Sequence, residues 1–157
     1  MVVSEYLWKP LLIDGTKFDL RVYVALTSIN PLRIYIYEDG LARFATGKYN
    51  DKTNTKQARF THLTNYSLNK NSTNFVENKD AMQDDHGHKW SHAALRKRLR
   101  KMGIDDVLLW KKMEDLIIKT VISVEHIINN ANEMYCPFPR TNCFELFGFD
   151  VLIDQEL

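Results

Sequence analysis

The stretch from Lys17 to Ser28, KFDLRVYVALTS, most constrains the fold because its apolar residues recur at every second position. These apolar residues are Phe18, Leu20, Val22, Val24 and Leu26. Side chains two apart point to one face of a β-strand, so the pattern predicts a strand with one face in a core. The opposite face begins with Lys17, Asp19 and Arg21. These charges lie either on a solvated surface, which the strand pattern alone favours, or in a cleft that holds phosphate and metal.

Length and composition are those of an ordinary globular protein. The 157 residues are 45% hydrophobic and 26% charged, enough for one domain or for a piece of a larger one. A net charge of +1 gives no global field toward nucleic acid or membrane. Cys136 and Cys143 fit no zinc spacing and are interpreted as reduced cytosolic thiols, with a single bridge left open. No apolar run of about 18 residues or signal peptide is present, so a soluble intracellular protein is expected.

Further strands are predicted on both sides of this stretch. Leu32 to Tyr37 alternates again, Glu38-Asp39-Gly40 has the composition of a hairpin turn, and Leu41 to Ala45 is a short strand that carries Arg43. Short loops between successive strands imply an antiparallel meander. The last strand is FELFGFDVLID, residues 144–154, with Asp150 on the face opposite Phe149 and with Gly148 as a candidate bulge.

Two helices and a polar loop are predicted between these strands. Ser91 is a candidate N-cap for a helix to about Met102, which Gly103 ends. Leu95, Leu99 and Met102 share one arc of that helix, and the rest is a basic face of Arg96, Lys97, Arg98, Arg100 and Lys101. This face is either solvated or a dock for an acidic partner.

Asp105 or Asp106 caps a second helix to about Asn132, whose broad apolar arc predicts packing on more than one side. Between the strands and the helices, residues 71–89 are expected to form a mobile polar loop. His86 and His88 lie in it beside acidic residues, but nothing holds them in place as metal ligands.

The order strands, helices, strand predicts an α+β fold: an antiparallel sheet with packed helices. Lysine and arginine on its strands can neutralise phosphates, and carboxylates can hold Mg²⁺. Asp150 lies in an otherwise apolar strand, and a buried carboxylate is costly unless it is paired or binds a cation. No glycine-rich phosphate loop is present. The residues by themselves therefore predict a candidate phosphate and Mg²⁺ site on the sheet.

Four motifs occur in a fixed order: KFDLRVYV, EDGLARFAT, HLTNYSLNK and CFELFGFDVLID. Together they resemble the tubulin–tyrosine ligase-like family over nearly the whole chain, and Lys89 through Ile118 looks like its glutamylase branch. The resemblance implies the C-terminal part of an ATP-grasp fold, so residues 1–157 are interpreted as a partial catalytic domain. It also implies a reaction. ATP phosphorylates a glutamate side chain of a protein, usually a tubulin tail, and free L-glutamate then attacks the acyl phosphate.

The resemblance implies a role for each matching residue. The adenine-contacting hinge matches Ser4, Glu5, Tyr6 and Leu7, although the family usually has glutamine at Ser4. Other nucleotide contacts match Lys17, Asp19, Thr64 and Asn65. The catalytic arginines, which handle phosphate and the carboxylate substrate, match Arg21 and Arg43. Residues near the incoming glutamate resemble Tyr66, Ser67 and Lys70, together with Arg43, and a Mg²⁺ ligand matches Asp150.

The chain also departs from the family. A Glu-x-Asn pair that holds Mg²⁺ is expected just beyond Leu157, and the N-terminal half with its phosphate-binding lysines is absent. A fragment is therefore expected, inactive by itself, with an active parent.

The partners implied by the resemblance are tubulin or microtubules through their acidic tails, and free L-glutamate, with no nucleic acid and no membrane. The implied location is the cytoplasm and the microtubule cytoskeleton, including the cilium or basal body. Two other functions stay open: a family ligase for glycine or tyrosine, and a non-catalytic microtubule-binding module that uses the basic face.

Overall fold

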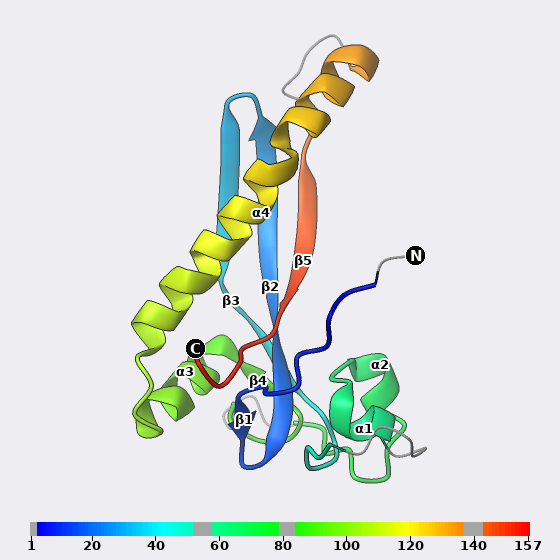
Figure 1. Ribbon diagram of the computed structural model, residues 1–157, viewed down its shortest axis with the longest axis vertical. Coiled ribbons are helices and arrows are strands. Elements are labelled where there is room, and N and C mark those ends of the chain that lie inside the picture. Colours follow the sequence, from blue (N-terminus) through cyan, green and yellow to red (C-terminus); the bar gives the residue numbers. More distant parts are fainter. Residues whose placement is uncertain (1–2, 52–57, 79–83, 137–142) are drawn as a thin grey trace.

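The computed structural model describes residues 3–51, 58–78, 84–136 and 143–157. Its elements in chain order are β1 (Leu12–Ile13), β2 (Thr16–Ile29), β3 (Leu32–Phe44), α1 (Ala58–His62), α2 (Tyr66–Asn69), β4 (Lys89–Ser91), α3 (His92–Lys101), α4 (Asp106–Tyr135) and β5 (Glu145–Val151). Long twisted strands run beside the long helix α4, and α1 and α2 lie near the lower end of β2 (Figure 1). The predicted α+β class is confirmed.

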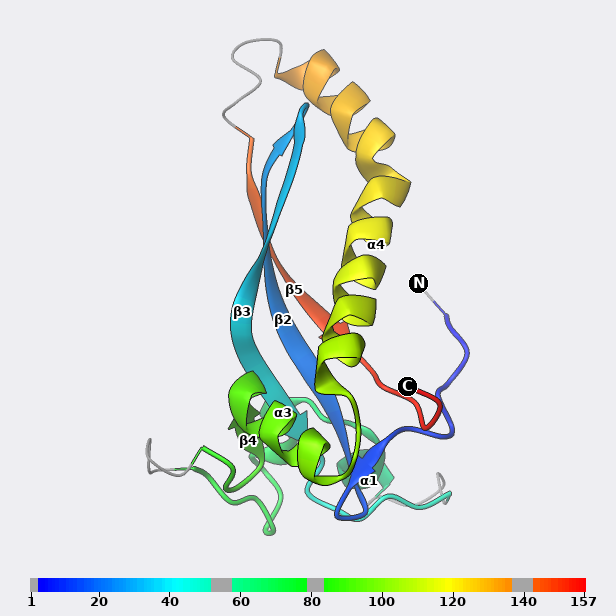
Figure 2. The ribbon, with the colours of Figure 1, turned by 90° about the vertical axis from the view of Figure 1, so that its left-hand side faces the viewer.

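The strand β2 organises the sheet. It pairs antiparallel with β3 along one side and with β5 along the other, while β1 pairs with its start and β4 with β3. The apolar set of β2 is between 0% and 5% exposed and packs against buried residues of α3 and α4, such as Leu95 and Met113. Figure 2 shows α4 along one face of the sheet of β2, β3 and β5. The predicted strand and its core-facing side are therefore confirmed.

The predicted hairpin turn at Glu38-Asp39-Gly40 is wrong, because β3 continues through it. The register with β2 shifts there, since Val22 faces Gly40 and Val24 faces Ile36. Asp39 Oδ1 accepts from the backbone N–H of Gly40 at 2.8 Å and of His92 at 2.9 Å. A Cβ on Gly40 would lie 2.4 Å from the Arg21 carbonyl oxygen. Residues typical of a turn form an irregular part of a strand here. Glycine is suited to this position because the backbone of β2 and the side chain of His92 approach it closely.

The bulge considered at Gly148 is also absent, since the register between β2 and β5 is unbroken from Glu145 to Val151. Glycine has a different structural role at this position. A Cβ there would lie 3.1 Å from the Arg21 Cδ atom, so its absence leaves room for the arginine side chain across the strand.

The predicted start and end of α3 are confirmed. Ser91 Oγ accepts from the Ala94 N–H at 3.0 Å, and Gly103 has a φ of +79° just after the helix. Leu95 and Leu99 are buried, but Met102 is exposed because it is the C-cap residue, beyond the last helical turn. Its predicted place in the packed stripe is wrong.

The helix α4 is capped by Asp105, whose Oδ1 accepts from the Val107 and Leu108 N–H groups at 3.0 Å. It ends at Tyr135, three residues later than predicted. One stripe is buried, including Leu109, Met113 and Ile117. Other apolar residues are exposed among the described parts of the chain: Leu108, Leu116, Ile118, Ile122, Val124 and Ile127. The prediction of packing on more than one side is wrong for the described residues, because the sheet covers one side of the helix.

The polar loop has no helix or strand in its described residues, 71–78 and 84–88. His88 ties its two sides together, since its Nδ1 accepts from the Val76 N–H at 3.0 Å. Lys89 belongs to β4 and not to the loop. Mobility of the loop stays a prediction, and residues 79–83 lie outside the described residues. No helix among the described residues is long and apolar enough to cross a bilayer.

His92 gives the fold a dependence on pH. It is 1% exposed, its ring lies 5.5 Å from the Trp110 ring, and its Nε2 has no hydrogen-bond partner among the described residues. Burial lowers the pKa of His92, against the opposing charge of Asp39. As the pH falls below about 6.5, His92 therefore takes up a proton in the unfolded chain before it does so in the folded protein. This uptake favours the unfolded state and lowers the stability of the fold.

We expect the free energy of unfolding to fall between pH 7 and pH 5, by at most about 1.4 kcal/mol per pH unit for this one proton. For the variant His92→Asn, the free energy of unfolding, measured by urea unfolding at pH 5, 6 and 7, should change less with pH. The control is His126→Asn, because His126 lies on α4 and is far in sequence from His92, Asp39 and Trp110. If the free energy of unfolding changed equally with pH in His92→Asn and in the unchanged protein, His92 would not be the source of the pH dependence.

Candidate functional site

The charged face of β2 is not a simple solvated surface. Lys17 and Asp19 are 3% and 5% exposed, whereas the Arg21 side chain is 31% exposed. The register places Asp19 opposite Arg43 on β3 and Arg21 opposite Asp150 on β5. Directly opposed residues on antiparallel strands share a face. The sheet therefore brings together the five charged residues that the sequence singled out.

Arg43 and Asp150 join these residues in one network. Arg43 donates to Asp19 through Nε at 2.8 Å and through Nη2 at 2.5 Å, and the same Nη2 lies 2.9 Å from Asp150 Oδ1. Arg21 donates to Asp150 through Nε at 2.6 Å and Nη2 at 3.2 Å. Both pairs are bidentate, a geometry that fixes a guanidinium plane. Two guanidinium groups thus meet at one carboxylate.

Exposure separates the two pairs. The carboxylate of Asp19 is buried, but the Asp150 side chain is 44% exposed, so the expectation of a buried Asp150 is wrong. Burial tends to raise the pKa of Asp150, and hydrogen bonds from Arg21 and Arg43 outweigh this and lower it. The hydrogen bond to Asp19 raises the pKa of Arg43. Asp150 is therefore a charged carboxylate within reach of solvent.

A second network surrounds Lys17. Its ammonium donates to the Tyr6 hydroxyl at 3.1 Å, and that hydroxyl lies 2.7 Å from His62 Nδ1. Burial lowers the pKa of Lys17, against the opposing charge of Asp19. Burial, with a smaller effect of Tyr49, raises the pKa of Tyr6, so the phenol stays neutral. The sequence did not reveal Tyr6 as the partner of Lys17, or His62 as the partner of the Tyr6 hydroxyl, because contacts across 11 and 56 residues leave no periodic signal.

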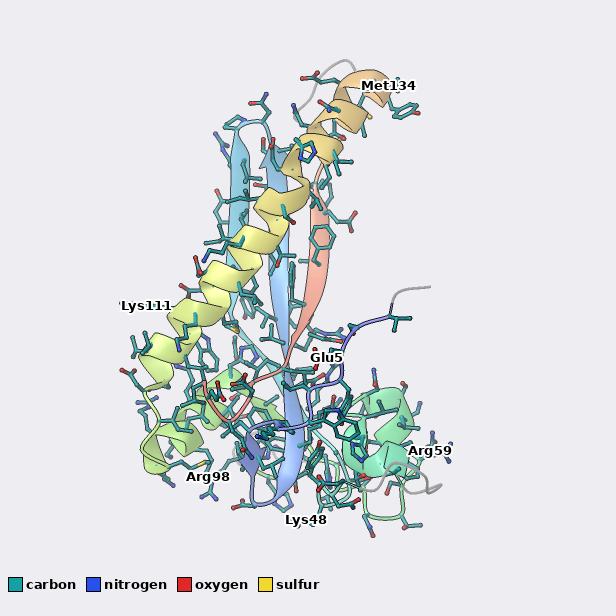
Figure 3. All side chains as sticks on the ribbon, viewed as in Figure 1. Glu5, Lys48, Arg59, Arg98, Lys111 and Met134 are labelled. Carbon is teal, nitrogen blue, oxygen red and sulfur yellow. The ribbon has the colours of Figure 1, made fainter. Side chains whose placement is uncertain are left out.

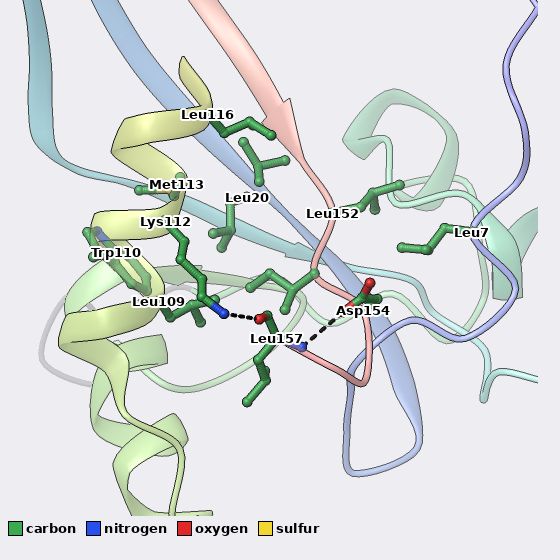
Figure 4. Close-up of a pocket in the computed structure, with 12 residues that line it drawn as sticks. Leu7, Leu20, Leu109, Trp110, Lys112, Met113, Leu116, Leu152, Asp154 and Leu157 are labelled. Atoms are coloured by element: carbon green, nitrogen blue, oxygen red, sulfur yellow. Dashed lines mark hydrogen bonds between the residues drawn. The ribbon is translucent and has the colours of Figure 1, made fainter. Parts of the chain in front are cut away.

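The other hinge residues lie apart from these networks. Ser4 and Glu5 are exposed, and Leu7 is half-buried. Leu7 lines an apolar cavity of ≈ 230 Å³ with Leu20, Met113 and residues at the end of the described chain. Figure 4 shows this cavity between α4 and the segment after β5, where Lys112 Nζ donates to the Leu157 carbonyl.

The HLTNYSLNK motif forms the end of α1 and the whole of α2. Thr64 is buried, whereas Asn65, Tyr66, Ser67 and Lys70 are exposed. Asn69, which the sequence did not single out, is 1% exposed. It accepts from Thr46 N–H and Oγ1 at 3.0 Å and donates to the Leu63 carbonyl at 2.8 Å. It thereby ties the motif to the end of β3, and its place within the motif was the available signal.

The basic face of α3 is largely paired within the chain. Arg96 Nε lies 2.5 Å from Asp106 Oδ2, and Arg100 Nε lies 3.2 Å from Asp106 Oδ1. Arg98 pairs with Asp14 and lies near the lower end of the molecule (Figure 3). Three of the five cations are therefore already engaged, which weakens the interpretation of this face as a dock for an acidic partner.

The described residues offer Mg²⁺ a single carboxylate on this face. No group of three His, Cys, Asp or Glu side chains suited to a metal occurs among them. Both Asp19 and Asp150 are paired with arginine, but Asp19 is buried and Asp150 is partly exposed, so Asp150 is the residue that a metal could reach. Mg²⁺ typically takes one or two carboxylates together with substrate phosphates, and one charged, accessible carboxylate meets part of that need.

The fold and the site together define a class: an antiparallel sheet with packed helices whose outer face carries paired arginines and aspartates. A sequence profile described as "Tubulin-tyrosine ligase family" matches residues 1–157, and the chain belongs to that family.

Among similar proteins, "Tubulin polyglutamylase TTLL5" of Mus musculus is 50% identical over the whole chain, which covers 12% of that relative. "Tubulin monoglutamylase TTLL4" of Mus musculus is 45% identical over the whole chain, 13% of that relative. "Tubulin polyglutamylase ttll-5" of Caenorhabditis elegans is 46% identical over the whole chain, 22% of that relative. The chain thus spans less than a quarter of the length of each of these relatives.

Proposed function

We propose that the protein containing this chain is an ATP-dependent ligase that adds glutamate to glutamate side chains of tubulin tails. The names of three relatives, two polyglutamylases and one monoglutamylase of tubulin, support the reaction class. The structural observation that carries the proposal is the meeting of Arg21 and Arg43 at Asp150. This arrangement suits a reaction in which negative charge develops on phosphate and carboxylate oxygens.

The proposed reaction passes through an acyl phosphate on the acceptor glutamate. ATP would donate the phosphoryl group of this intermediate. Fixed guanidinium groups hold such oxygens bidentately, and arginine keeps its charge when it is desolvated. Arg21 is the more accessible of the two arginines, while Arg43 is anchored by Asp19. Asp150 would hold Mg²⁺ together with the nucleotide phosphates.

The nucleotide contacts proposed from the resemblance are Ser4, Glu5, Tyr6, Leu7, Lys17, Asp19, Thr64 and Asn65. The hydrogen bond from Lys17 to Tyr6 supports this grouping, because it joins the hinge segment to the charged strand. Tyr66, Ser67 and Lys70 are proposed to lie near the incoming L-glutamate, together with Arg43. The proposed partners are tubulin or microtubules, with neither nucleic acid nor membrane. The proposed location is the cytoplasm and microtubules, including those of the cilium or basal body.

The test is amino-acid transfer by the full-length protein onto microtubules, with labelled glutamate, glycine or tyrosine. We expect incorporation of glutamate that requires both ATP and Mg²⁺, and background signal with the other two amino acids. Microtubules from which the acidic tails have been removed by protease serve as the control and should accept little label. Transfer of glycine or tyrosine in place of glutamate would contradict the proposal and would favour another ligase of the family.

A further inference from the structure

Lys89 is a further charged residue on the face that carries the site. It pairs directly opposite Arg43 in the antiparallel register of β3 and β4, so the two side chains share a face. The next residue, Trp90, packs against Phe44 at 4.7 Å on the core side, as strand alternation requires. Lys89 therefore extends the row formed by Asp19 and Arg43 toward α2.

Its charge is not balanced by a carboxylate within the described parts of the chain. On this face the ion pairs engage Arg21 and Arg43, and none of the ion pairs among the described residues includes Lys89. The Lys89 ammonium lies 3.7 Å from the centroid of the Tyr66 ring. A ring face attracts a cation but accepts no strong hydrogen bond, so the three ammonium donors stay available to an anionic ligand.

A small cavity opens beside this ammonium. Its volume is ≈ 80 Å³, and it is lined by Lys89, Tyr66, Phe75, Val76, Glu77 and Asn78. The Phe75 ring lies 5.7 Å from the Tyr66 ring and stacks on His88 at 5.5 Å, so the aromatic wall is held in place. Glu77 is exposed, where water and salt screen its charge. The cavity thus combines an apolar wall with one cation, and its size is that of about three water molecules.

We propose that Lys89 binds the side-chain carboxylate of the incoming amino acid and so selects glutamate. This inference rests on the proposed ligase function and names the residue that sets its amino-acid specificity. The apolar wall would contact the methylene groups, and the ammonium would pair with the carboxylate. Glycine has no side chain for this cavity, and tyrosine is both uncharged and too large for it. A site built for a charged group strongly rejects analogues that lack it, because its own polar group is then left unpaired.

The experiment uses the full-length protein with Lys89→Met, which keeps the length of the side chain and removes its charge, and with Lys89→Arg. In transfer assays, Lys89→Met should raise the KM for glutamate by about 10- to 100-fold and leave the KM for ATP within about twofold. The preference for glutamate over glutamine, as a ratio of kcat/KM values, should fall by a similar factor. Lys89→Arg should retain most of the preference because it keeps the charge.

The matched control is Lys97→Met, since Lys97 is an exposed lysine on α3, outside the site. It should leave both the KM for glutamate and the glutamate preference unchanged, and thermal unfolding should show that both methionine variants are folded. An unchanged preference in Lys89→Met, or an equal rise in the KM for ATP, would overturn the role of Lys89 while the proposed function stands. Absence of glutamate transfer by the unchanged protein would instead overturn the proposed function, and the role of Lys89 with it.

Discussion

Replacing Asp19 by alanine is expected to lower the free energy of unfolding by about 3–5 kcal/mol, because it leaves a buried arginine without its main partner. Arg43 donates two hydrogen bonds to Asp19, and both side chains are less than a tenth exposed. An uncompensated charge in such surroundings is costly, and its remaining partner, Asp150, is partly solvated. Urea unfolding at pH 7 measures the change.

The matched control for this prediction is Asp150→Ala, which removes a carboxylate from the same network at an exposed position. Its expected cost is at most about 1 kcal/mol, since exposed ion pairs contribute little. The double variant Asp19→Ala/Arg43→Met should recover part of the loss, because it removes the stranded charge as well. If Asp19→Ala and Asp150→Ala proved equally mild, the buried pair would not be a stabilising contact of the fold.

Replacing Arg21 by lysine in the full-length protein is expected to lower kcat for glutamate transfer by about 10²–10³-fold. Lysine keeps the positive charge but loses the planar fork that holds two oxygens at once. Arg21 is the accessible arginine of the network, and a Cβ at Gly148 would crowd its side chain. The loss should therefore come from charge placement during the reaction, with the fold little changed. Steady-state kinetics and thermal unfolding separate the two effects.

The control for Arg21→Lys is Arg98→Lys, which makes the same chemical change at an arginine that pairs with Asp14 away from the site. It should leave kcat unchanged within about twofold. A rise in KM alone for Arg21→Lys, with kcat preserved, would show that Arg21 binds substrate equally well in the ground state and the transition state, and would contradict its catalytic role.

Local signals in the sequence predicted local structure well. The alternation after Lys17 predicted β2 and its core side, and Ser91 and Asp105 are the helix caps observed. The failures came where a distant element decides the outcome. Gly40 has the composition of a turn, but His92 and Arg21 crowd it into an irregular strand. The apolar breadth of α4 could not show which of its sides the sheet would cover.

The candidate site divides in the same way. Alternation placed Lys17, Asp19 and Arg21 on one face, the predicted strands added Arg43 and Asp150 as candidates, and the family resemblance supplied their roles. Which charges pair, and which remain accessible, depends on strand register. A strand pattern repeats every two residues whatever its partner is, so by itself it favoured the solvated interpretation and could not show the cleft.

The sequence by itself therefore determined the strand, its two faces, the helix caps and the family, because periodicity, capping and motif order are properties of neighbouring residues. Only the tertiary structure decided that Asp19 is buried against Arg43, that Asp150 is shared by two arginines, and that Lys17 reaches Tyr6. It also placed Lys89 beside Arg43 with a ring and a cavity around it. These contacts join residues up to 129 positions apart, which the pairing of whole strands brings together. The observed pairing leaves few buried charges without a partner, because an unpaired buried charge is costly.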